Sequence, residues 1–297
     1  GEIKLDKTFK AIDNPSFLSV SPNKNYLYAV SRTSTKIENS GGYVSAYRIK
    51  TSGELEFINK QPSNGTGPCH IDVSHDGKYV AIATYGGGTI SVYPVIAGGG
   101  LLPASSTLQF EGSGPNKARQ KAPHAHSVKF SPFNSLVFSA DLGTDQLNIF
   151  SFDDGKLAAT GQQFVKLAQG AGPRHFDFHP EGKFIYVINE LNSTVEVVES
   201  MNGAWHTVQK IATLPQGFDE DNYCADIHVA GNGEFVYGSN RGHNSIVVFK
   251  MNQESKKLTF VSVTSTRGKW PRNFTLSPDG SYLIAANQHS NNITVFR

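Results

Sequence analysis

Short apolar runs recur along the chain in pairs, and a polar turn separates the two runs of each pair. One example covers residues 171–190, where apolar runs at 176–178 and 184–188 flank a His-Pro-Glu-Gly turn. This pattern predicts a β-hairpin. Similar turns return roughly every fifty residues, and a fixed period of this length indicates a repeat architecture. They lie near Lys24, Gly77, Asn134, Gly182, Gly233 and Gly280.

Each hairpin is followed by a third run that alternates apolar and polar residues, as half-buried strands do. These third runs are residues 43–47, 89–93, 146–150, 194–198, 245–249 and 292–296. A fourth, more polar run comes next, with the composition of an exposed edge strand. The fourth runs are residues 55–58, 108–110, 164–167, 208–212 and 258–263. Four strands in about fifty residues are the unit of a β-propeller blade.

We therefore predict an all-β protein with a single β-propeller domain over residues 1–297, built from four-stranded antiparallel blades. Helix signals are weak, since Gly or Pro interrupts most windows. Residues 1–12 are expected to form an edge strand of the closing blade. Six closed blades and seven blades with one incomplete both fit the six visible repeats. The repeats cover about 13–62, 66–111, 122–168, 171–215, 222–266 and 269–297.

Composition excludes several classes of partner. The net charge is only +2, and no run of Lys or Arg is long enough to follow a phosphate backbone, so no nucleic-acid partner is expected. No apolar stretch reaches about 18 residues, so no membrane association is expected. The chain starts at Gly1 and shows no signal peptide. We expect the cytoplasm, or the periplasm if a leader has been removed, and a monomer or weak homodimer.

Aligning the six turns defines two positions per repeat, which we call slot one and slot two. Positions that serve structure should repeat, whereas a functional site must break the symmetry. Antiparallel pairing places both slots at the same rim, opposite the turn. Slot one, expected just before the innermost strand, holds Ser16, Cys69, His126, Arg174, Ala225 and Arg272. Slot two, after the second strand, holds Arg32, Tyr85, Leu142, Glu190, Arg241 and Gln288.

The slots gather four arginines, one glutamate and one histidine, and this asymmetry is the main functional signal. Each of these residues also has an ordinary structural explanation. An arginine at a strand end is often solvated, Glu190 could serve merely to balance the charge of the arginines, and His126 could be a histidine packed at the rim. Four arginines converging on one rim favour a binding site instead. His124 and His126 lack a Cys pair or a carboxylate cluster at ligand spacing, so we predict no metal and no cofactor.

Several segments at the slots also resemble a known family. They are residues 14–17 (Asn-Pro-Ser-Phe), 67–70 (Gly-Pro-Cys-His), 123–126 (Pro-His-Ala-His), 172–175 (Gly-Pro-Arg-His), 239–243 (Ser-Asn-Arg-Gly-His) and 270–274 (Trp-Pro-Arg-Asn-Phe). As a set they resemble the seven-bladed β-propeller lactonase family, which includes bacterial 6-phosphogluconolactonases and the carboxy-cis,cis-muconate lactonizing enzyme. The resemblance implies seven blades, one of them incomplete here. It also implies a catalytic set of His126, Arg174, Glu190 and Arg241.

The resulting hypothesis is a hydrolase of the 6-phosphogluconolactonase type, acting on a small anionic sugar lactone of the pentose phosphate pathway. Arg174 and Arg241 would bind the anion, because guanidinium forks suit phosphate and carboxylate groups. Surrounding positive charge should lower the pKa of both His126 and Glu190, leaving neutral His126 as general base and ionised Glu190 as an orienting group. Further substrate-binding residues would be Arg32, His124, His175 and Arg272. Alternatives are a lyase or cyclase acting on an unsaturated dicarboxylate and a non-catalytic binding scaffold.

Overall fold

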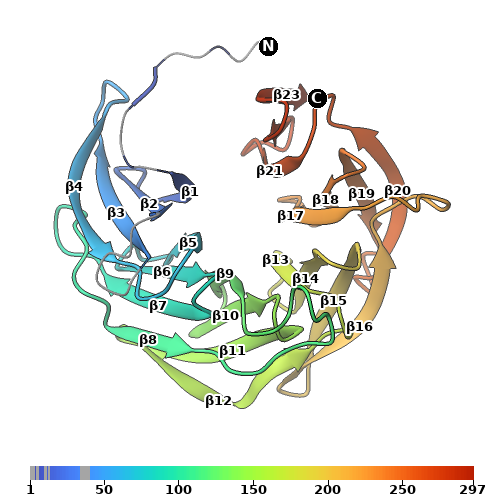
Figure 1. Ribbon diagram of the computed structural model, residues 1–297, viewed down its shortest axis with the longest axis horizontal. Coiled ribbons are helices and arrows are strands. Elements are labelled where there is room, and N and C mark those ends of the chain that lie inside the picture. Colours follow the sequence, from blue (N-terminus) through green and yellow to red (C-terminus); the bar gives the residue numbers. More distant parts are fainter. Residues whose placement is uncertain (1–3, 5–6, 10–11, 13, 34–40) are drawn as a thin grey trace. The chain divides into compact units, whose positions relative to one another are not determined.

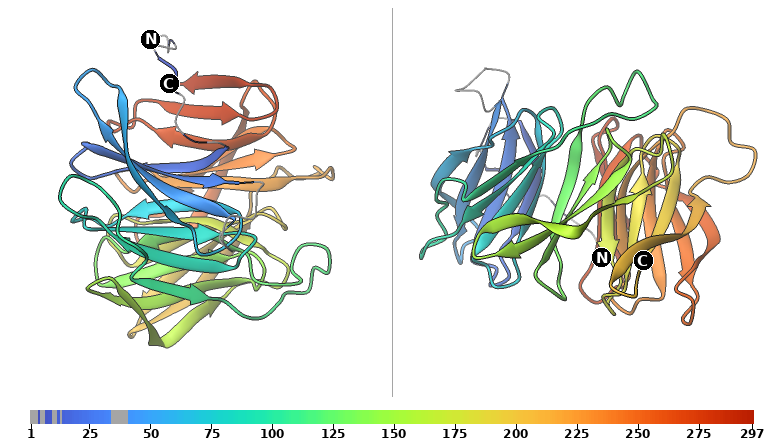
Figure 2. Two further views of the ribbon diagram at one scale, coloured as in Figure 1. Left: turned by 60° about the vertical axis from the view of Figure 1, so that its left-hand side comes forward. Right: turned by 90° about the horizontal axis from the view of Figure 1, so that it is seen from below.

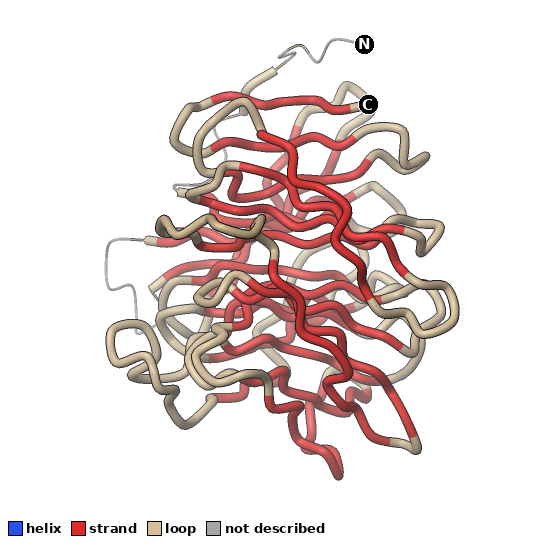
Figure 3. Tube along the Cα trace, turned by 90° about the vertical axis from the view of Figure 1, so that its right-hand side faces the viewer, coloured by secondary structure: helices blue, strands red, loops and turns tan. Residues whose placement is uncertain are grey.

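The computed structural model consists of strands, turns and loops (Figure 3). It describes residues 4, 7–9, 12, 14–33 and 41–297, and these contain no helix, so none that could span a membrane. The described residues form five four-stranded sheets and one three-stranded sheet, all antiparallel and each in chain order or its reverse. The prediction of an all-β protein made of four-stranded antiparallel blades is confirmed.

The chain forms two compact units, residues 1–164 and 165–297, and each is described by itself. Unit 1 holds three blades whose innermost strands are β1, β5 and β9 (Figure 1). Its last strand runs two residues past the boundary. The strands are β1 (Pro15–Val20), β2 (Tyr26–Arg32), β3 (Gly42–Ile49), β4 (Leu55–Pro62), β5 (Pro68–Val73), β6 (Tyr79–Thr84), β7 (Thr89–Pro94), β8 (Ser106–Gln109), β9 (Ala125–Phe130), β10 (Leu136–Asp141), β11 (Gln146–Asp153) and β12 (Lys156–Lys166).

Unit 2 also holds three blades, and their innermost strands are β13, β17 and β21. Figure 2 shows its sheets in two further views. The strands are β13 (Pro173–Phe178), β14 (Phe184–Asn189), β15 (Thr194–Met201), β16 (Ala204–Ala212), β17 (Tyr223–Val229), β18 (Phe235–Arg241), β19 (Ser245–Met251), β20 (Leu258–Ser265), β21 (Pro271–Leu276), β22 (Leu283–Asn287) and β23 (Asn292–Phe296). Every hairpin expected from the apolar runs is observed.

The turns of these hairpins use one recurring device. In the β5–β6 turn, the Ser74 hydroxyl donates to the Asp76 carboxylate at 2.7 Å and accepts the Tyr79 amide at 3.0 Å. Gly77 completes the turn at a φ of 70°, which glycine adopts at little cost. In the β13–β14 turn His179 replaces the serine and accepts the Glu181 amide at 3.1 Å. His179 therefore serves the turn.

Neighbouring blades within a unit pack through alternate apolar residues. In unit 1, Tyr28, Ile82 and Tyr93 are fully buried in one such core. Partly buried carboxylates add polar links between innermost strands: Asp72 on β5 accepts the Phe130 amide of β9 at 2.9 Å. In unit 2, the Asp177 carboxylate of β13 accepts the Val229 amide of β17 at the same distance. These bonds hold the innermost strands of successive blades in a fixed register.

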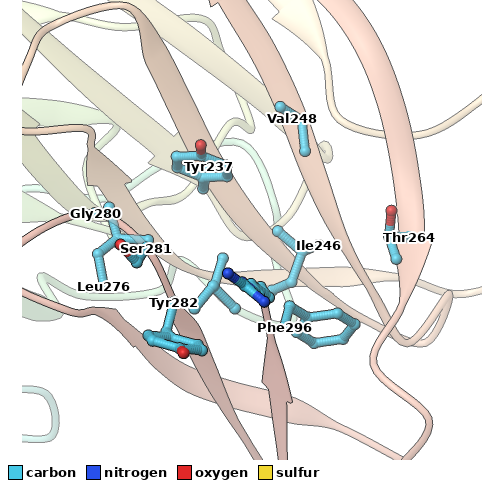
Figure 4. Close-up of a pocket in the computed structure, with 11 residues that line it drawn as sticks. Tyr237, Ile246, Val248, Thr264, Leu276, Gly280, Ser281, Tyr282 and Phe296 are labelled. Atoms are coloured by element: carbon cyan, nitrogen blue, oxygen red, sulfur yellow. The ribbon is translucent and has the colours of Figure 1, made fainter. Parts of the chain in front are cut away.

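The last blade of unit 2 has three strands, β21 to β23. The edge strand expected over residues 1–12 lies largely outside the described residues, and residues 4, 7–9 and 12 are not in a strand. Beside this blade lies a cavity of about 280 Å³ (Figure 4). Its lining residues are Tyr237, Ile246, Val248, Thr264, Leu276, Gly280, Ser281, Tyr282, Leu283, Phe296 and Arg297, and none of the predicted site residues is among them.

Candidate functional site

The slot-one residues lie inside the innermost strands, at β-bulges, and not before the strands as the sequence analysis expected. In β13, Pro173 pairs with Asn189 and His175 pairs with Ile188, which leaves Arg174 as the extra residue. The hydrophobic pattern missed this because a bulge adds a residue without changing the apolar run that follows. A bulge re-aims the side chain that it carries. The same irregularity occurs at Ser16, Cys69, His126 and Arg272, and between Cys224 and Ile227.

Slot two is fixed by a backbone hydrogen bond that recurs from blade to blade. The Glu190 amide donates to the Gly172 carbonyl at 2.7 Å, two residues before the bulge. The equivalent bond joins Tyr85 to Gly67 and Gln288 to Trp270, each at 2.9 Å. The two slots of a blade are therefore neighbours, as predicted, and their side chains share one end of the sheet.

In unit 2 three slot residues form a buried ion cluster. The Glu190 Oε2 atom lies 3.1 Å from Arg174 Nε and 2.7 Å from Arg241 Nη2. All three residues are at most 5% exposed. Arg241 also donates from Nε to the Tyr223 carbonyl at 3.0 Å and from Nη2 to the Cys224 carbonyl at 2.9 Å. One carboxylate thus holds two guanidinium groups, and the cluster carries excess positive charge.

A buried histidine, His175, also contacts the Arg174 guanidinium. The Arg174 Nη1 atom donates to the Ala225 carbonyl and lies 3.3 Å from His175 Nε2. A guanidinium only donates, so His175 Nε2 accepts and its Nδ1–H donates to Asp226 Oδ1 at 2.7 Å. His175 is only 4% exposed and contacts Arg174, and its role as a substrate-binding residue stays a prediction.

Asp226 contacts this cluster through His175, and the sequence patterns did not single it out. Its carboxylate accepts bonds from His175, from the Asn273 side chain and from the Phe274 amide, and His228 Nε2 lies 3.3 Å away. Burial alone would raise the pKa of Asp226, but His228 and His175 hold it well below its usual value. The available signal was the position after the bulge, where the six repeats carry Phe17, His70, Ser127, His175, Asp226 and Asn273.

Arg174 keeps its charge in this environment. Burial, followed by the charges of Arg241 and Arg272, lowers the pKa of Arg174 to about 9, while Glu190 acts in the opposite direction. At neutral pH the group is therefore still a cation. Arg272 is half-buried, and its Nη1 lies 3.5 Å from the Gln288 Oε1. Its positive charge acts on Arg174.

Unit 1 brings together two of the predicted histidines around an aromatic ring. The Tyr85 ring stacks on His124 at 4.3 Å between centroids, and the His126 ring meets it edge-on at 5.5 Å. His126 is buried, with Nδ1 4.0 Å from the Cys69 Sγ. Arg119 Nη2 donates to the Tyr85 hydroxyl at 3.3 Å. Tyr85 and Arg119 were not among the predicted site residues, although Tyr85 occupies slot two.

Arg32, the remaining predicted binding residue, lies on the first blade of unit 1. Its Nε donates to the Pro68 carbonyl at 3.3 Å, and its side chain is half-buried. Both cysteines, Cys69 and Cys224, are free and buried. Among the residues that the structure describes, no group of three His, Cys, Asp or Glu side chains is arranged to hold a metal ion.

Comparison with known proteins defines the class. The family model described as "Lactonase, 7-bladed beta-propeller" matches residues 1–297. The chain belongs to this lactonase family, as the sequence resemblance implied. Over 288 residues it is 38% identical to the 6-phosphogluconolactonase of Bacillus subtilis (strain 168), a match that covers 96% of this chain and 80% of the relative.

Two further relatives agree. The 6-phosphogluconolactonase of Formosa agariphila is 36% identical over 304 residues, which covers 100% of this chain and 85% of the relative. The solved structure of the periplasmic gluconolactonase of Pseudomonas aeruginosa has a TM-score of 0.92 and 31% identity, and the match covers 100% of this chain and 84% of that one. All three relatives carry the name of a sugar lactonase.

Proposed function

We propose that this protein hydrolyses an anionic sugar lactone, with 6-phosphogluconolactone as the leading substrate. The buried Arg174–Glu190–Arg241 cluster is the observation that carries the proposal. Two desolvated guanidinium groups share one carboxylate, so one positive charge is left for a ligand. Membership of the lactonase family and the names of the two bacterial 6-phosphogluconolactonases support the same activity.

The donors left for an anion follow from the contacts. Arg174 donates from Nη1 and its Nε faces Glu190 in an ion pair, whereas Arg241 donates from Nε and Nη2. Neither Nη2 of Arg174 nor Nη1 of Arg241 bonds to a residue that the structure describes. Each arginine therefore keeps one terminal nitrogen for the substrate, either for its phosphate or for the oxyanion of the tetrahedral intermediate. One such donor contributes on the order of a hundredfold to a thousandfold in rate.

The reaction itself needs one base and no cofactor. Water adds to the lactone carbonyl carbon, the ring C–O bond breaks, and the proton taken from the water returns to the ring oxygen. We propose His126 as the group that takes and returns this proton, because a neutral imidazole suits both steps. Glu190 accepts a hydrogen bond from Arg241 and is ion-paired with Arg174, so we propose it as an orienting group. Arg32, His124 and Arg272 are proposed as substrate contacts.

The charge of the substrate also bears on compartment. A sugar phosphate is strongly hydrated and does not cross a lipid bilayer unaided. A lactonase for 6-phosphogluconolactone therefore belongs in the cytoplasm, which we propose for this protein, whereas an unphosphorylated gluconolactone would fit the periplasm. We also propose a monomer or weak homodimer, which light scattering after size-exclusion chromatography measures directly.

A hydrolysis assay over paired phosphorylated and plain aldonolactones tests the proposal. We expect turnover of both, with a kcat/KM about tenfold to a hundredfold higher for the phosphorylated member, since charged hydrogen bonds contribute about 1.5–3 kcal/mol. Lactonization of an unsaturated dicarboxylate without lactone hydrolysis would instead establish a cyclase. Absence of any turnover would favour a binding scaffold.

A further inference from the structure

Trp270 has a backbone conformation that a bulky residue rarely adopts. Its φ is 67°, in the left-handed region where a Cβ atom is strained. Its carbonyl accepts the recurring slot-two hydrogen bond, from Gln288, and in other blades the residues in this role are Asn14, Gly67 and Gly172. Their φ angles are 50°, 64° and 63°. In the blade of β9–β12 the His124 carbonyl accepts the equivalent bond from Leu142 at 3.0 Å, and His124 is not among the residues with a positive φ. The hydrogen bond alone therefore does not require the left-handed conformation, and where that conformation occurs glycine or asparagine suits it better than tryptophan.

The backbone of Trp270 gives no reason for an indole. Its amide donates to the Asn244 side chain at 2.7 Å, and its carbonyl accepts the Gln288 amide, and a glycine would keep both bonds. Strain of this kind persists where the surroundings enforce it and is frequent at functional sites. The side chain must therefore account for the residue.

The indole lies against the ion cluster. The Arg241 Cζ atom is 5.4 Å from the centre of the Trp270 ring, within the range of a cation–π interaction. His289 stacks on the indole at 4.7 Å between centroids with an interplanar angle of 12°, and Tyr223 lies 6.0 Å away. Tyr223 also accepts from Arg241 Nε. The stack of His289, Trp270 and Arg241 runs from an exposed histidine to a buried guanidinium.

We propose that Trp270 is a positioning residue for Arg241, and this inference rests on the proposed function. The indole covers the guanidinium, keeps water from it and fixes its plane while Nε and Nη2 hold Tyr223, Cys224 and Glu190. Nη1 is then the nitrogen presented to the substrate anion. Because the ring lies beside the cation and carries no hydrogen bond to the substrate in this role, its loss weakens anion binding more than turnover.

Three variants separate this role from simple packing. Trp270→Gly removes the ring and relieves the backbone, Trp270→Phe keeps a ring, and Asn14→Gly changes the matched backbone position in unit 1. For Trp270→Gly we expect the KM for the phosphorylated lactone to rise about tenfold, with kcat and the KM for the plain lactone changed less than about twofold. Trp270→Phe should recover most of the loss, and Asn14→Gly should leave KM unchanged.

Melting temperatures complete the test. In Trp270→Gly the relief of strain opposes the lost packing, so we expect a shift within about 3 °C. A merely structural tryptophan would instead give a large fall in melting temperature and equal losses on both lactones. That result, or a Trp270→Phe variant as weak as Trp270→Gly with an unchanged fold, would overturn the proposal.

A binding readout distinguishes failure of this inference from failure of the proposed function. In a Trp205→Phe background Trp270 is the remaining tryptophan, since the chain has two. Titration with inorganic phosphate should change its fluorescence, and Arg241→Lys should weaken the response at least about tenfold. A fluorescence change on phosphate binding without lactone turnover would contradict only the proposed function. Lactone turnover without a fluorescence response to phosphate, and with an unchanged KM in Trp270→Gly, would contradict only the role of Trp270.

Discussion

In unit 2 the bulge of β13 presents Arg174 to a carboxylate and a second arginine, whereas in unit 1 the bulge of β9 presents His126 to a tyrosine ring. The backbone arrangement is the same in both blades, with an extra residue in the innermost strand. The chemistry differs completely: buried charges in one unit, and aromatic groups with an imidazole in the other. The repeated backbone thus provides the same bulge in each of these blades, and the side chain at the bulge determines which chemical groups surround it.

The comparison is tested most strongly at His126. If unit 1 supplies the base, His126→Ala should lower kcat about a hundredfold to ten-thousandfold, because proton transfer by a positioned side chain contributes that much. Ser16→Ala, at the matching bulge of β1, should change kcat less than about twofold. Steady-state kinetics on the phosphorylated lactone measure both. Equal small effects would remove His126 from the role and leave unit 1 without a proposed base.

The free energy of unfolding of a Glu190 variant tests whether the ion cluster of unit 2 is buried. Glu190→Ala leaves two buried guanidinium groups without their shared carboxylate, which should cost about 3–5 kcal/mol of unfolding free energy. Gln288→Ala, at slot two of the last blade, should stay within about 0.5 kcal/mol. Urea unfolding followed by circular dichroism gives both values. A cost below 1 kcal/mol for Glu190→Ala would mean that the cluster is solvated and does not act as buried ion pairs.

Arg174 should matter for selection of the anion more than for folding. Arg174→Lys keeps a charge but loses the planar fork, so kcat/KM for the phosphorylated lactone should fall about tenfold to a hundredfold. The plain lactone should lose less than about threefold. Arg48→Ala removes an exposed positive charge outside both slots and serves as the control. Equal losses on both lactones would assign Arg174 to the chemistry or to folding.

Two aspartates of the innermost strands, the buried Asp226 and the half-buried Asp72, should respond to acid in opposite directions. His228 and His175 hold the pKa of Asp226 well below normal against the effect of burial, whereas burial, only partly offset by Lys129, raises the pKa of Asp72. A lowered folded pKa contributes stability above the unfolded value of about 3.9 and loses it as the pH falls through the folded pKa. A raised pKa instead favours the folded state as acid protonates the group.

These pH effects are the smallest that we predict, and unfolding free energies measured from pH 6 to pH 2 test them. Asp226→Asn should flatten the loss of stability below about pH 4 relative to the unsubstituted protein. Asp72→Asn should make the loss steeper, because a group that gained stability on protonation is gone. An acid slope that does not change in Asp226→Asn would mean that its neighbours do not hold the carboxylate ionised.

Much of this molecule follows from its sequence, and the failures share a cause. Alternation of apolar residues located the hairpins, and comparison of the repeats found Arg174, Glu190 and Arg241 before any geometry was known. The bulges were missed because an extra, unpaired residue leaves the neighbouring alternation intact. Asp226 was missed because its carboxylate bonds to residues of two other strands, β13 and β21. Trp270 resembles an ordinary aromatic until its φ angle is known.

Asp226 also affects how unit 2 unfolds locally. Repeat architectures tend to unfold piecewise, because each repeat contacts only its neighbours. Here one carboxylate on β17 bonds to His175 on β13 and to Asn273 and Phe274 on β21, so a single group couples three blades. Amide hydrogen exchange in these three innermost strands should therefore proceed as one cooperative event. In Asp226→Asn the exchange of β21 should separate from that of β13.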